Sequence, residues 1–189
     1  ASDTVVVSAA SGAVGSIAAQ VAKLAGARVI GIAGGPVKAD YLTDTLGLDA
    51  AIDYKNEDVS ARLRETCPDG IDLYFDNVGG DILSDVLGQM NYRGRVVVCG
   101  GISQYGGSMD VQGPSNFLSV VTHSLTIQGF TMRDYMHRVP EALEWLFGTW
   151  KSDQLFFREH LIHGIECFPD AFEMLFSGQN HGKLLLKVN

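Results

Sequence analysis

The chain has few cysteines and no long apolar run. Its three cysteines are widely spaced and form no Cys-x-x-Cys pair, which indicates reduced thiols in a cytosol-like compartment rather than a disulfide framework. No stretch reaches the roughly 18 apolar residues that a membrane span requires. No basic segment followed by an apolar one opens the sequence, so no signal peptide is expected. These absences predict a soluble, cytoplasmic protein without a membrane partner.

Positive charge is also scarce. The chain carries 14 Lys and Arg against 22 Asp and Glu, a net charge of −8. Such a field disfavours nucleic acid and anionic membrane surfaces as partners. An anionic cofactor would have to be held by local features. No metal site is expected, because His160 and His163 would point to opposite faces of a strand and no second ligand pair lies nearby.

A glycine-bearing turn follows the first predicted strand. The β-branched run Val5-Val-Val is followed by Ala10-Ser-Gly-Ala-Val-Gly15, which opens a helix. Unpaired N–H groups and the positive dipole end at such a helix start suit a pyrophosphate. Gly12 would let the main chain approach the phosphates and Gly15 would let the helix pack closely on the strand, while Ala10 stands at the usual first glycine. A tight turn without a ligand remains the alternative on this pattern alone.

Strands and helices alternate along most of the chain. A stripe of Val14, Ile17, Ala18, Val21 and Ala22 predicts the core-facing side of the first helix, which ends at Gly26. The further predicted elements are strand 27–33, helix 36–47, strand 50–54, helix 57–65, strand 71–75, helix 78–87 and strand 95–99. This order is typical of an α/β doubly wound parallel sheet, the Rossmann fold.

The second half of the chain contains a long loop and an extra segment. Residues 100–113 are polar and glycine-rich, too long for a simple turn, and are therefore a functional candidate. A helix at 115–123, a strand at 125–130 and a helix at 139–151 are expected to complete the sheet. Residues 155–165 (extended), 170–176 (helical) and 184–188 (a strand) have no obvious place in it.

The residues after the second strand predict the cofactor type. An acidic residue about 20 positions after the glycine turn would bind the ribose 2′-hydroxyl of NAD. The window Ile30 to Gly35 contains none, and the next charged residue is Lys38, which offers a point charge to a 2′-phosphate. The pattern therefore favours NADP(H). Asp40 would oppose a phosphate nearby, and a solvated surface lysine is the alternative for Lys38.

Five motifs together resemble a known family. They are Val-Ser-Ala-Ala-Ser-Gly-Ala-Val-Gly (7–15), Ile-Asp-Tyr-Lys (52–55), Phe-Asp-Asn-Val-Gly-Gly (75–80), Cys-Gly-Gly-Ile-Ser-Gln-Tyr (99–105) and Asn-His-Gly-Lys (180–183). The chain resembles the nucleotide-binding half of zinc-independent medium-chain dehydrogenase/reductases, most closely the alkenal/one reductase branch with its prostaglandin and curcumin reductases. The resemblance implies NADPH-dependent hydride transfer to the C=C bond of α,β-unsaturated ketones or aldehydes. Two alternatives remain open: a quinone oxidoreductase of the same superfamily, and a non-catalytic NADP(H)-binding module.

The resemblance also implies a domain division and an assembly. Family members begin with a substrate domain that this sequence lacks. Residues 1–160 are expected to form the dinucleotide-binding domain, and residues 161–189 to complete the absent domain. The chain alone is then expected to be inactive. Family members are often dimers joined near the strand at 125–130, so a homodimer is expected.

The same resemblance assigns the site. Tyr54 would contact the phosphate-bearing ribose, Asn77 the cofactor, and the segment from Cys99 to Tyr105 the nicotinamide. Tyr105 is the catalytic candidate, because a phenol can donate a hydrogen bond to the enolate oxygen formed after hydride transfer. Its alternative role is only to fold its loop. The predicted cofactor-binding residues are Gly12, Ala13, Val14, Gly15, Lys38, Tyr54, Asn77, Cys99, Gly100, Gly101, Ile102, Ser103, Gln104, Tyr105, Phe130, Thr131, Met132 and Asn180.

Overall fold

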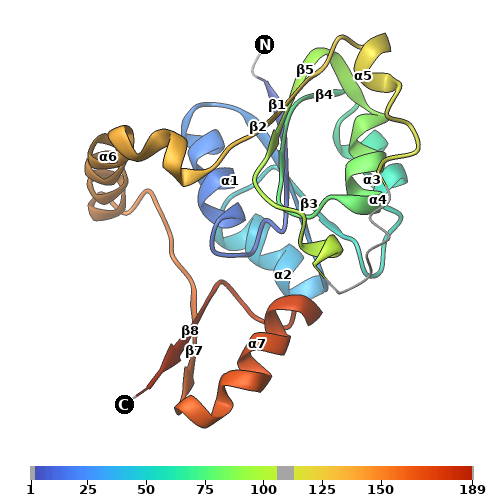
Figure 1. Cartoon of the computed structure of the whole chain (residues 1–189). Helices are drawn as coiled ribbons and strands as arrows, with labels where there is room; N and C mark the ends of the chain where they lie inside the picture. The colour runs from blue at the N-terminus through green and yellow to red at the C-terminus, as the bar shows by residue number, and fades with distance from the viewer. Residues whose placement is uncertain (1–2, 106–112, 189) are drawn as a thin grey trace.

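Six parallel strands form the main sheet. The computed structural model describes residues 3–105 and 113–188, with the strands in the order β3-β2-β1-β4-β5-β6 (Figure 1). Their bounds are β1 Thr4–Ser8, β2 Arg28–Ala33, β3 Ala50–Asp53, β4 Ile71–Asp76, β5 Met90–Val98 and β6 Thr126–Gly129. The predicted doubly wound sheet is confirmed. The strand order reverses between β1 and β4, and in open α/β sheets ligands bind at the carboxyl ends of the strands at such a point.

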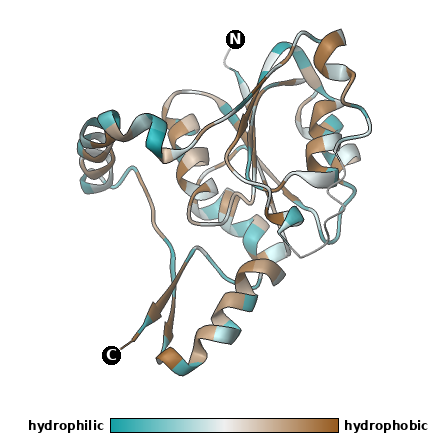
Figure 2. Ribbon diagram, viewed as in Figure 1, coloured by the Kyte–Doolittle hydropathy of each residue, from teal (hydrophilic) through white to brown (hydrophobic). Residues whose placement is uncertain are grey.

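Helices cover both faces of this sheet (Figure 1). One face carries α1 (Gly15–Leu24) and α2 (Pro36–Asp40), which continues as a π-helix to Thr45; the other carries α3 (Val59–Thr66), α4 (Gly80–Leu87) and α5 (Ser119–Thr122). A hydrophobic core lies on each face of the sheet, and successive residues of β1 point alternately into the two. Val5 and Val7 pack with α1, and Val6 packs with α3 and α4. Figure 2 shows the hydrophobic residues concentrated on these central strands.

The bounds of β5 and α5 differ from the prediction. β5 begins at Met90 rather than at residue 95, and α5 spans only Ser119–Thr122 rather than 115–123. The register of β5 against β4 shifts between Ile71 and Leu73, and Arg93 has a φ of 64°. The early part of β5 is thus irregular and partly exposed. It lacks the regular apolar pattern from which a strand is predicted, so the predicted strand began too late.

The predicted core-facing stripe of α1 is correct only in part: Ala22 packs against the core and, with Ala18, lines the groove that faces the sheet. Val14 is 53% exposed and Val21 is 37% exposed, whereas the buried residues of the helix are Gly15, Ser16, Ala19 and Gln20. The small residues Gly15 and Ala19 allow the helix to lie close to β1, so larger side chains turn outward. Close backbone approach, rather than apolar volume, therefore decides which side of this helix is buried.

The C-terminal residues form a separate small unit. After α6 (Val139–Lys151), β7 (Glu159–His163) and β8 (Lys183–Lys187) pair in parallel and are joined through α7 (Phe168–Ser177). They lie outside the main sheet (Figure 1). The boundary expected between residues 160 and 161 falls inside β7. Among the described residues no helix has both the length and the apolar character needed to cross a bilayer.

Gln20 of α1 attaches this unit to the main sheet. Its Nε2 donates to the carbonyl oxygens of Ser16 and Phe156, both at 3.0 Å, and its Oε1 accepts from the Phe156 N–H at 2.8 Å. Leu155, next to Phe156, is 2% exposed. Two further contacts hold the unit in place: a bridge between Gly12 and Gly182, and a hydrogen bond from Lys38 to the carbonyl of Gly178.

Replacing Gln20 by alanine is expected to lower the free energy of unfolding by about 2 kcal/mol, because the main-chain N–H and C=O of Phe156 would both lose their Gln20 partner in a partly buried setting. Urea unfolding would measure the change, and hydrogen exchange at the Phe156 amide would locate it. Gln154→Ala, an exposed site, is the control and should change the free energy by less than about 0.5 kcal/mol. Equal effects of the two substitutions would contradict the role of Gln20.

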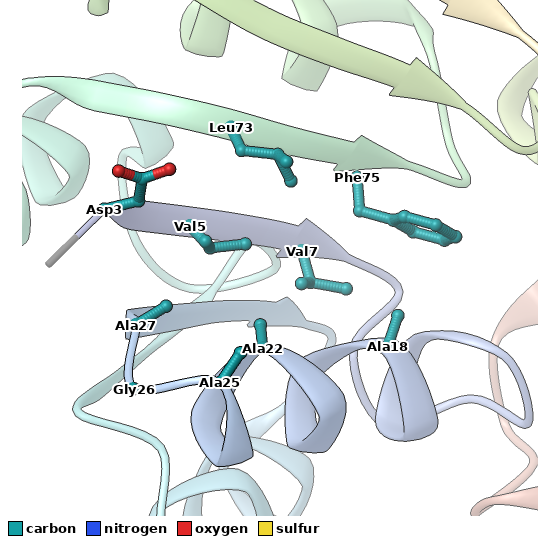
Figure 3. A pocket seen from close by; sticks show the side chains of 10 residues that line it. All are labelled: Asp3, Val5, Val7, Ala18, Ala22, Ala25, Gly26, Ala27, Leu73 and Phe75. Atoms are coloured by element: carbon teal, nitrogen blue, oxygen red, sulfur yellow. The ribbon is translucent and has the colours of Figure 1, made fainter. Parts of the chain in front are cut away.

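An apolar groove lies between α1 and the sheet (Figure 3). It has a volume of about 370 Å³ and is lined mainly by Val5 and Val7 of β1, Leu73 and Phe75 of β4, and small residues of α1. None of the predicted cofactor residues lines it. The groove is therefore distinct from the carboxyl edge of the sheet, where the predicted cofactor residues lie.

Candidate dinucleotide site

The predicted site residues follow the carboxyl ends of the strands. Gly12 to Gly15 follow β1, Lys38 follows β2, Tyr54 follows β3, Asn77 follows β4, residues 99–105 follow β5 and residues 130–132 follow β6. Because the strands are parallel, these segments share one edge of the sheet. The structure therefore brings together segments that are up to about a hundred residues apart in the sequence.

The turn after β1 leaves main-chain donors open. The Gly12 N–H donates to the carbonyl of Ala9 at 2.9 Å, and the Ser16 N–H donates to the carbonyl of Gly12 at 3.0 Å. Within the described part of the chain, the N–H groups of Ala13 and Val14 have no hydrogen-bond partner. Open donors at the start of α1 fit an anionic group such as a pyrophosphate.

Gly15 and Ala9 determine the shape of this turn. A Cβ added at Gly15 would lie well inside van der Waals distance of the Ala9 carbonyl oxygen and 2.9 Å from its carbonyl carbon. Ala9 itself has a φ of 47°, a left-handed conformation that is unusual for alanine. Ala10, the expected stand-in for the first glycine, is fully buried, and its N–H donates to the carbonyl of Ile32. Nothing in the sequence pattern indicates this conformation of Ala9.

Lys38 and Tyr54 meet at Gly178. The Lys38 ammonium donates to the Gly178 carbonyl at 2.7 Å, and a Cβ on Gly178 would lie 3.6 Å from the Tyr54 hydroxyl. Lys38 is only 8% exposed, and its pKa is lowered by burial and by the nearby Lys55 and Arg158. Asp40 instead lines a shallow groove with residues such as Arg62 and is not among the charges that shift Lys38.

Asp53, for which the sequence predicted no role, orders the segment before Lys38. Its Oδ1 accepts from the N–H groups of Gly35 at 2.6 Å and Lys55 at 3.0 Å, and Oδ2 accepts from the Asn56 amide at 2.6 Å. Burial opposes ionisation of Asp53, but these hydrogen bonds and the charge of Lys55 outweigh it and hold its pKa below the ordinary value. The carboxylate thus ties the loop after β2 to the end of β3.

Asn77 joins the ends of β1 and β4. Its Nδ2 donates to the Ser8 carbonyl at 2.7 Å, and its N–H donates to the Ser8 hydroxyl oxygen at 2.9 Å. The neighbouring Asp76 is buried and accepts from the Tyr74 hydroxyl at 2.8 Å and from the N–H of Gly79 at 2.9 Å. The pKa of Tyr74 is raised well above its ordinary value by burial and by Asp76. Ser8 and Asp76 lie within the sequence motifs, but their role in supporting the site was not predicted.

The loop after β5 is hydrogen-bonded to the loop after β4. The N–H groups of Cys99 and Gly100 donate to the Asp76 carbonyl, and that of Ser103 donates to the Val78 carbonyl. The Ser103 hydroxyl also donates to the Val78 carbonyl, at 2.5 Å. Burial and Asp76 raise the pKa of the Cys99 thiol. The two loops therefore form one connected rim.

Tyr105 lies over its own loop. Its hydroxyl oxygen accepts from the Gly101 N–H at 3.3 Å, and its side chain is 63% exposed. The hydroxyl proton is not used in that bond and can still be donated. Residues 106–112 of the predicted functional loop lie outside the described residues.

The segment after β6 packs through aromatic rings. Phe130 lies 6.4 Å from Phe75 and 5.9 Å from Tyr135, measured between ring centroids. Thr131 caps the following 3₁₀ turn, with its N–H and hydroxyl both donating to Asp134. Met132 is 62% exposed. Of this segment's main-chain N–H groups, that of Thr131 is therefore already engaged.

The C-terminal unit brings Asn180 to the turn after β1. Asn180 Nδ2 donates to the Gly182 carbonyl at 3.0 Å, and Gly182 forms the bridge with Gly12. Within residues 3–105 and 113–188, no group of three or more His, Cys, Asp or Glu side chains could hold a metal ion. The edge is therefore lined by main-chain donors, amides, hydroxyls and basic side chains.

Comparison with known proteins agrees with this arrangement. The family model described as zinc-binding dehydrogenase matches residues 13–148. The chain is 44% identical over 188 residues to an NADP(+)-dependent 2-alkenal reductase of Nicotiana tabacum, covering 99% of this chain and 54% of that protein. It is 38% identical over 192 residues to the NADPH-dependent curcumin reductase of Escherichia coli, covering 98% of this chain and 55% of that protein.

A solved structure is also similar. The crystal structure of CurA from Vibrio vulnificus in complex with NADPH superposes with a TM-score of 0.94 at 41% identity, covering 100% of this chain and 57% of that one. The chain thus spans about half the length of the relatives it matches.

Proposed function

The chain belongs to the zinc-binding dehydrogenase family, and we propose that it is the NADP(H)-binding part of a reductase that transfers hydride to the C=C bond of α,β-unsaturated ketones or aldehydes. The convergence of Lys38 and Tyr54 at Gly178 carries this proposal. A buried ammonium beside a phenol hydroxyl fits a 2′-phosphate, and Asp40 lies on a different groove. The names of the alkenal and curcumin reductases that the chain matches support both the cofactor and the reaction.

The residues of the carboxyl edge have separable tasks in this proposal. The N–H groups of Ala13 and Val14 bind the pyrophosphate at the start of α1. Residues 99–105 and 130–132 position the nicotinamide, and Asn77 and Asn180 line the cofactor. Bound NADPH supplies the hydride. Tyr105 donates its hydroxyl hydrogen bond to the carbonyl oxygen of the substrate, where negative charge develops as the β-carbon accepts hydride.

Cofactor binding by the 189-residue chain tests the first part of the proposal. We expect NADPH to bind more tightly than NADH in a fluorescence titration, and equal affinities would contradict the assignment. The reaction is tested by restoring the sequence upstream of Ala1 and assaying enone reduction. Reduction of quinones but not enones would favour a quinone oxidoreductase, and absence of turnover with tight NADPH binding would favour a non-catalytic module.

Tyr105→Phe tests the catalytic assignment in the restored protein. Loss of the donated hydrogen bond is expected to lower kcat about 100-fold, the lower end of general acid–base effects. KM for NADPH should change less than about 2-fold, since phenylalanine keeps the ring in place. Tyr92→Phe, on the exposed early part of β5, is the matched control and should leave kcat unchanged. An unchanged kcat would leave Tyr105 with its loop-folding role alone.

The remaining assignments concern assembly. The exposed phenylalanines 168, 172 and 176 of α7 and the two-stranded sheet β7-β8, too small to be stable alone, support a role for residues 161–189 in completing a substrate domain. β6 is an edge strand of the main sheet, which supports a homodimer joined through that edge. We propose a cytoplasmic location for the enzyme. Sedimentation of the restored protein would show whether the dimer forms.

A further inference from the structure

Basic side chains gather where the C-terminal unit meets the loops after β2 and β3. Lys55 and Arg158 are close enough to Lys38 to lower its pKa, and Lys38, Arg158 and His160 all affect His181. These five residues are called the cation cluster below. None of the ion pairs formed within residues 3–105 and 113–188 includes a member of it. Lys55 also faces Asp53, whose pKa it lowers, but in a chain of net charge −8 the gathering of Lys38, Arg158 and two histidines without an ion-pair partner indicates an anion site.

Three members of the cluster, Arg158, His160 and His181, come from the C-terminal unit, and their contacts fix their positions. The Arg158 guanidinium lies 4.9 Å from the centre of the Tyr41 ring, on the π-helical turn that follows Lys38. The His181 N–H donates to Nδ1 of His160 at 3.4 Å. Nδ1 of His181 is buried and has no hydrogen-bond partner in the described structure. An orphaned ring nitrogen among cations is the arrangement that an incoming anion would complete.

We propose that Arg158 and His181 join Lys38 in binding the 2′-phosphate of NADP(H), and that His181 takes up a proton as this phosphate binds. The inference rests on the proposed function for the identity of the ligand. A phosphate monoester carries up to two negative charges and accepts several hydrogen bonds. It therefore fits a site with several basic side chains better than a ligand with a single carboxylate would. In this arrangement the C-terminal unit discriminates between NADP and NAD directly, in addition to Lys38.

The direction of the proton coupling follows from the surrounding charges. Burial lowers the pKa of His181 in the free chain, and Lys38, Arg158 and His160 lower it further. A phosphate dianion reverses the sign of the local field and raises this pKa. Between the two values the free histidine is neutral and the complexed one is charged. The contribution of His181 to phosphate affinity is therefore present below the pKa of the complex and is lost as the pH rises through it.

Adenosine 2′,5′-bisphosphate and 5′-AMP, titrated into the 189-residue chain, test the role of Arg158. Arg158→Gln should weaken binding of the bisphosphate about 10-fold, a typical loss for one charge-assisted hydrogen bond. It should weaken binding of 5′-AMP less than about 2-fold. Arg158→Lys should restore part of the loss, because it keeps the charge. Lys187→Gln, at the end of β8, is the control and should affect neither ligand. Equal weakening of both ligands by Arg158→Gln, with no rescue by lysine, would overturn the assignment.

Calorimetry tests the proton at His181. Titrating the bisphosphate at about pH 6.5, near the ordinary histidine pKa, in two buffers of different ionisation enthalpy gives the number of protons bound. The wild-type chain should take up more protons than His181→Gln, and equal numbers would overturn the coupling. A Lys38→Ala chain that still prefers the bisphosphate as strongly as the wild type would instead overturn the proposed function. The two failures are thereby distinguished.

Discussion

Replacing Lys38 by alanine is expected to weaken NADPH binding about 10- to 100-fold while leaving NADH binding within about 2-fold, because a charge-assisted hydrogen bond contributes roughly 1.5–3 kcal/mol. Lys38 is 8% exposed, so its ammonium is already largely desolvated and loses little further hydration when a phosphate arrives. The neighbouring cations lower its pKa, and a bound dianion relieves that repulsion. NADPH and NADH affinities measured by fluorescence titration would give the two changes.

A structural effect of Lys38→Ala can be separated from an electrostatic one. The substitution also removes the hydrogen bond to the Gly178 carbonyl, which helps to hold the C-terminal unit. A purely structural role would weaken NADPH and NADH alike. Lys38→Arg should keep most of the discrimination, since it keeps the charge, and Lys151→Ala, at the exposed end of α6, should change neither affinity. Parallel losses for both cofactors in Lys38→Ala would contradict a role in selecting NADP.

The strand and helix order of the main sheet could be predicted because its signals are local. Val5 to Val7, Ile71 to Phe75 and the helices between them differ in apolar period, and the parallel sheet follows from their alternation. The buried side of α1 could not be predicted in the same way. Gly15 and Ala19 face the core because the helix approaches Ala9 closely, and such an approach depends on backbone geometry that side-chain hydropathy does not record.

The outer parts of the candidate site also depend on contacts that are distant in sequence. Lys38 could be identified from its spacing after the glycine turn, but its neighbour Gly178 is 140 residues away. Asp53 and Asp76 look like ordinary strand-end acids, and only the folded chain shows that they accept several main-chain N–H groups each. Arg158 lies outside all five sequence motifs, and His181 lies inside the Asn-His-Gly-Lys motif without a role assigned to it there. A sequence motif predicts the local backbone conformation. It does not predict which basic side chains, distant in sequence, pack around it in the folded chain.

Gly15→Ala is expected to lower the free energy of unfolding by about 3 kcal/mol, the upper part of the range for added bulk in a packed core. At an ordinary glycine in a helix, replacement by alanine instead raises the free energy of unfolding by up to about 1 kcal/mol. The new Cβ would overlap the Ala9 carbonyl oxygen, which is main chain and cannot rotate away. Ala9 is already in a left-handed conformation at a φ of 47°, so the turn has little freedom to adapt. Urea unfolding of the 189-residue chain would measure the loss.

Gly12→Ala separates the stability of this turn from its proposed function. A Cβ at Gly12 would lie 3.2 Å from the same Ala9 oxygen, a contact that a shift of a few tenths of an ångström relieves, so the free energy of unfolding should change by less than about 1 kcal/mol. If the turn binds a pyrophosphate, the added methyl group faces the ligand, and NADPH and NADH should both bind about 10-fold more weakly. A Gly12→Ala chain that binds both cofactors normally would place the pyrophosphate elsewhere. In this proposal Gly15 allows the helix to pack closely, and Gly12 allows a pyrophosphate to approach the main chain. The two substitutions together therefore decide whether the turn serves helix packing alone or also binds a ligand.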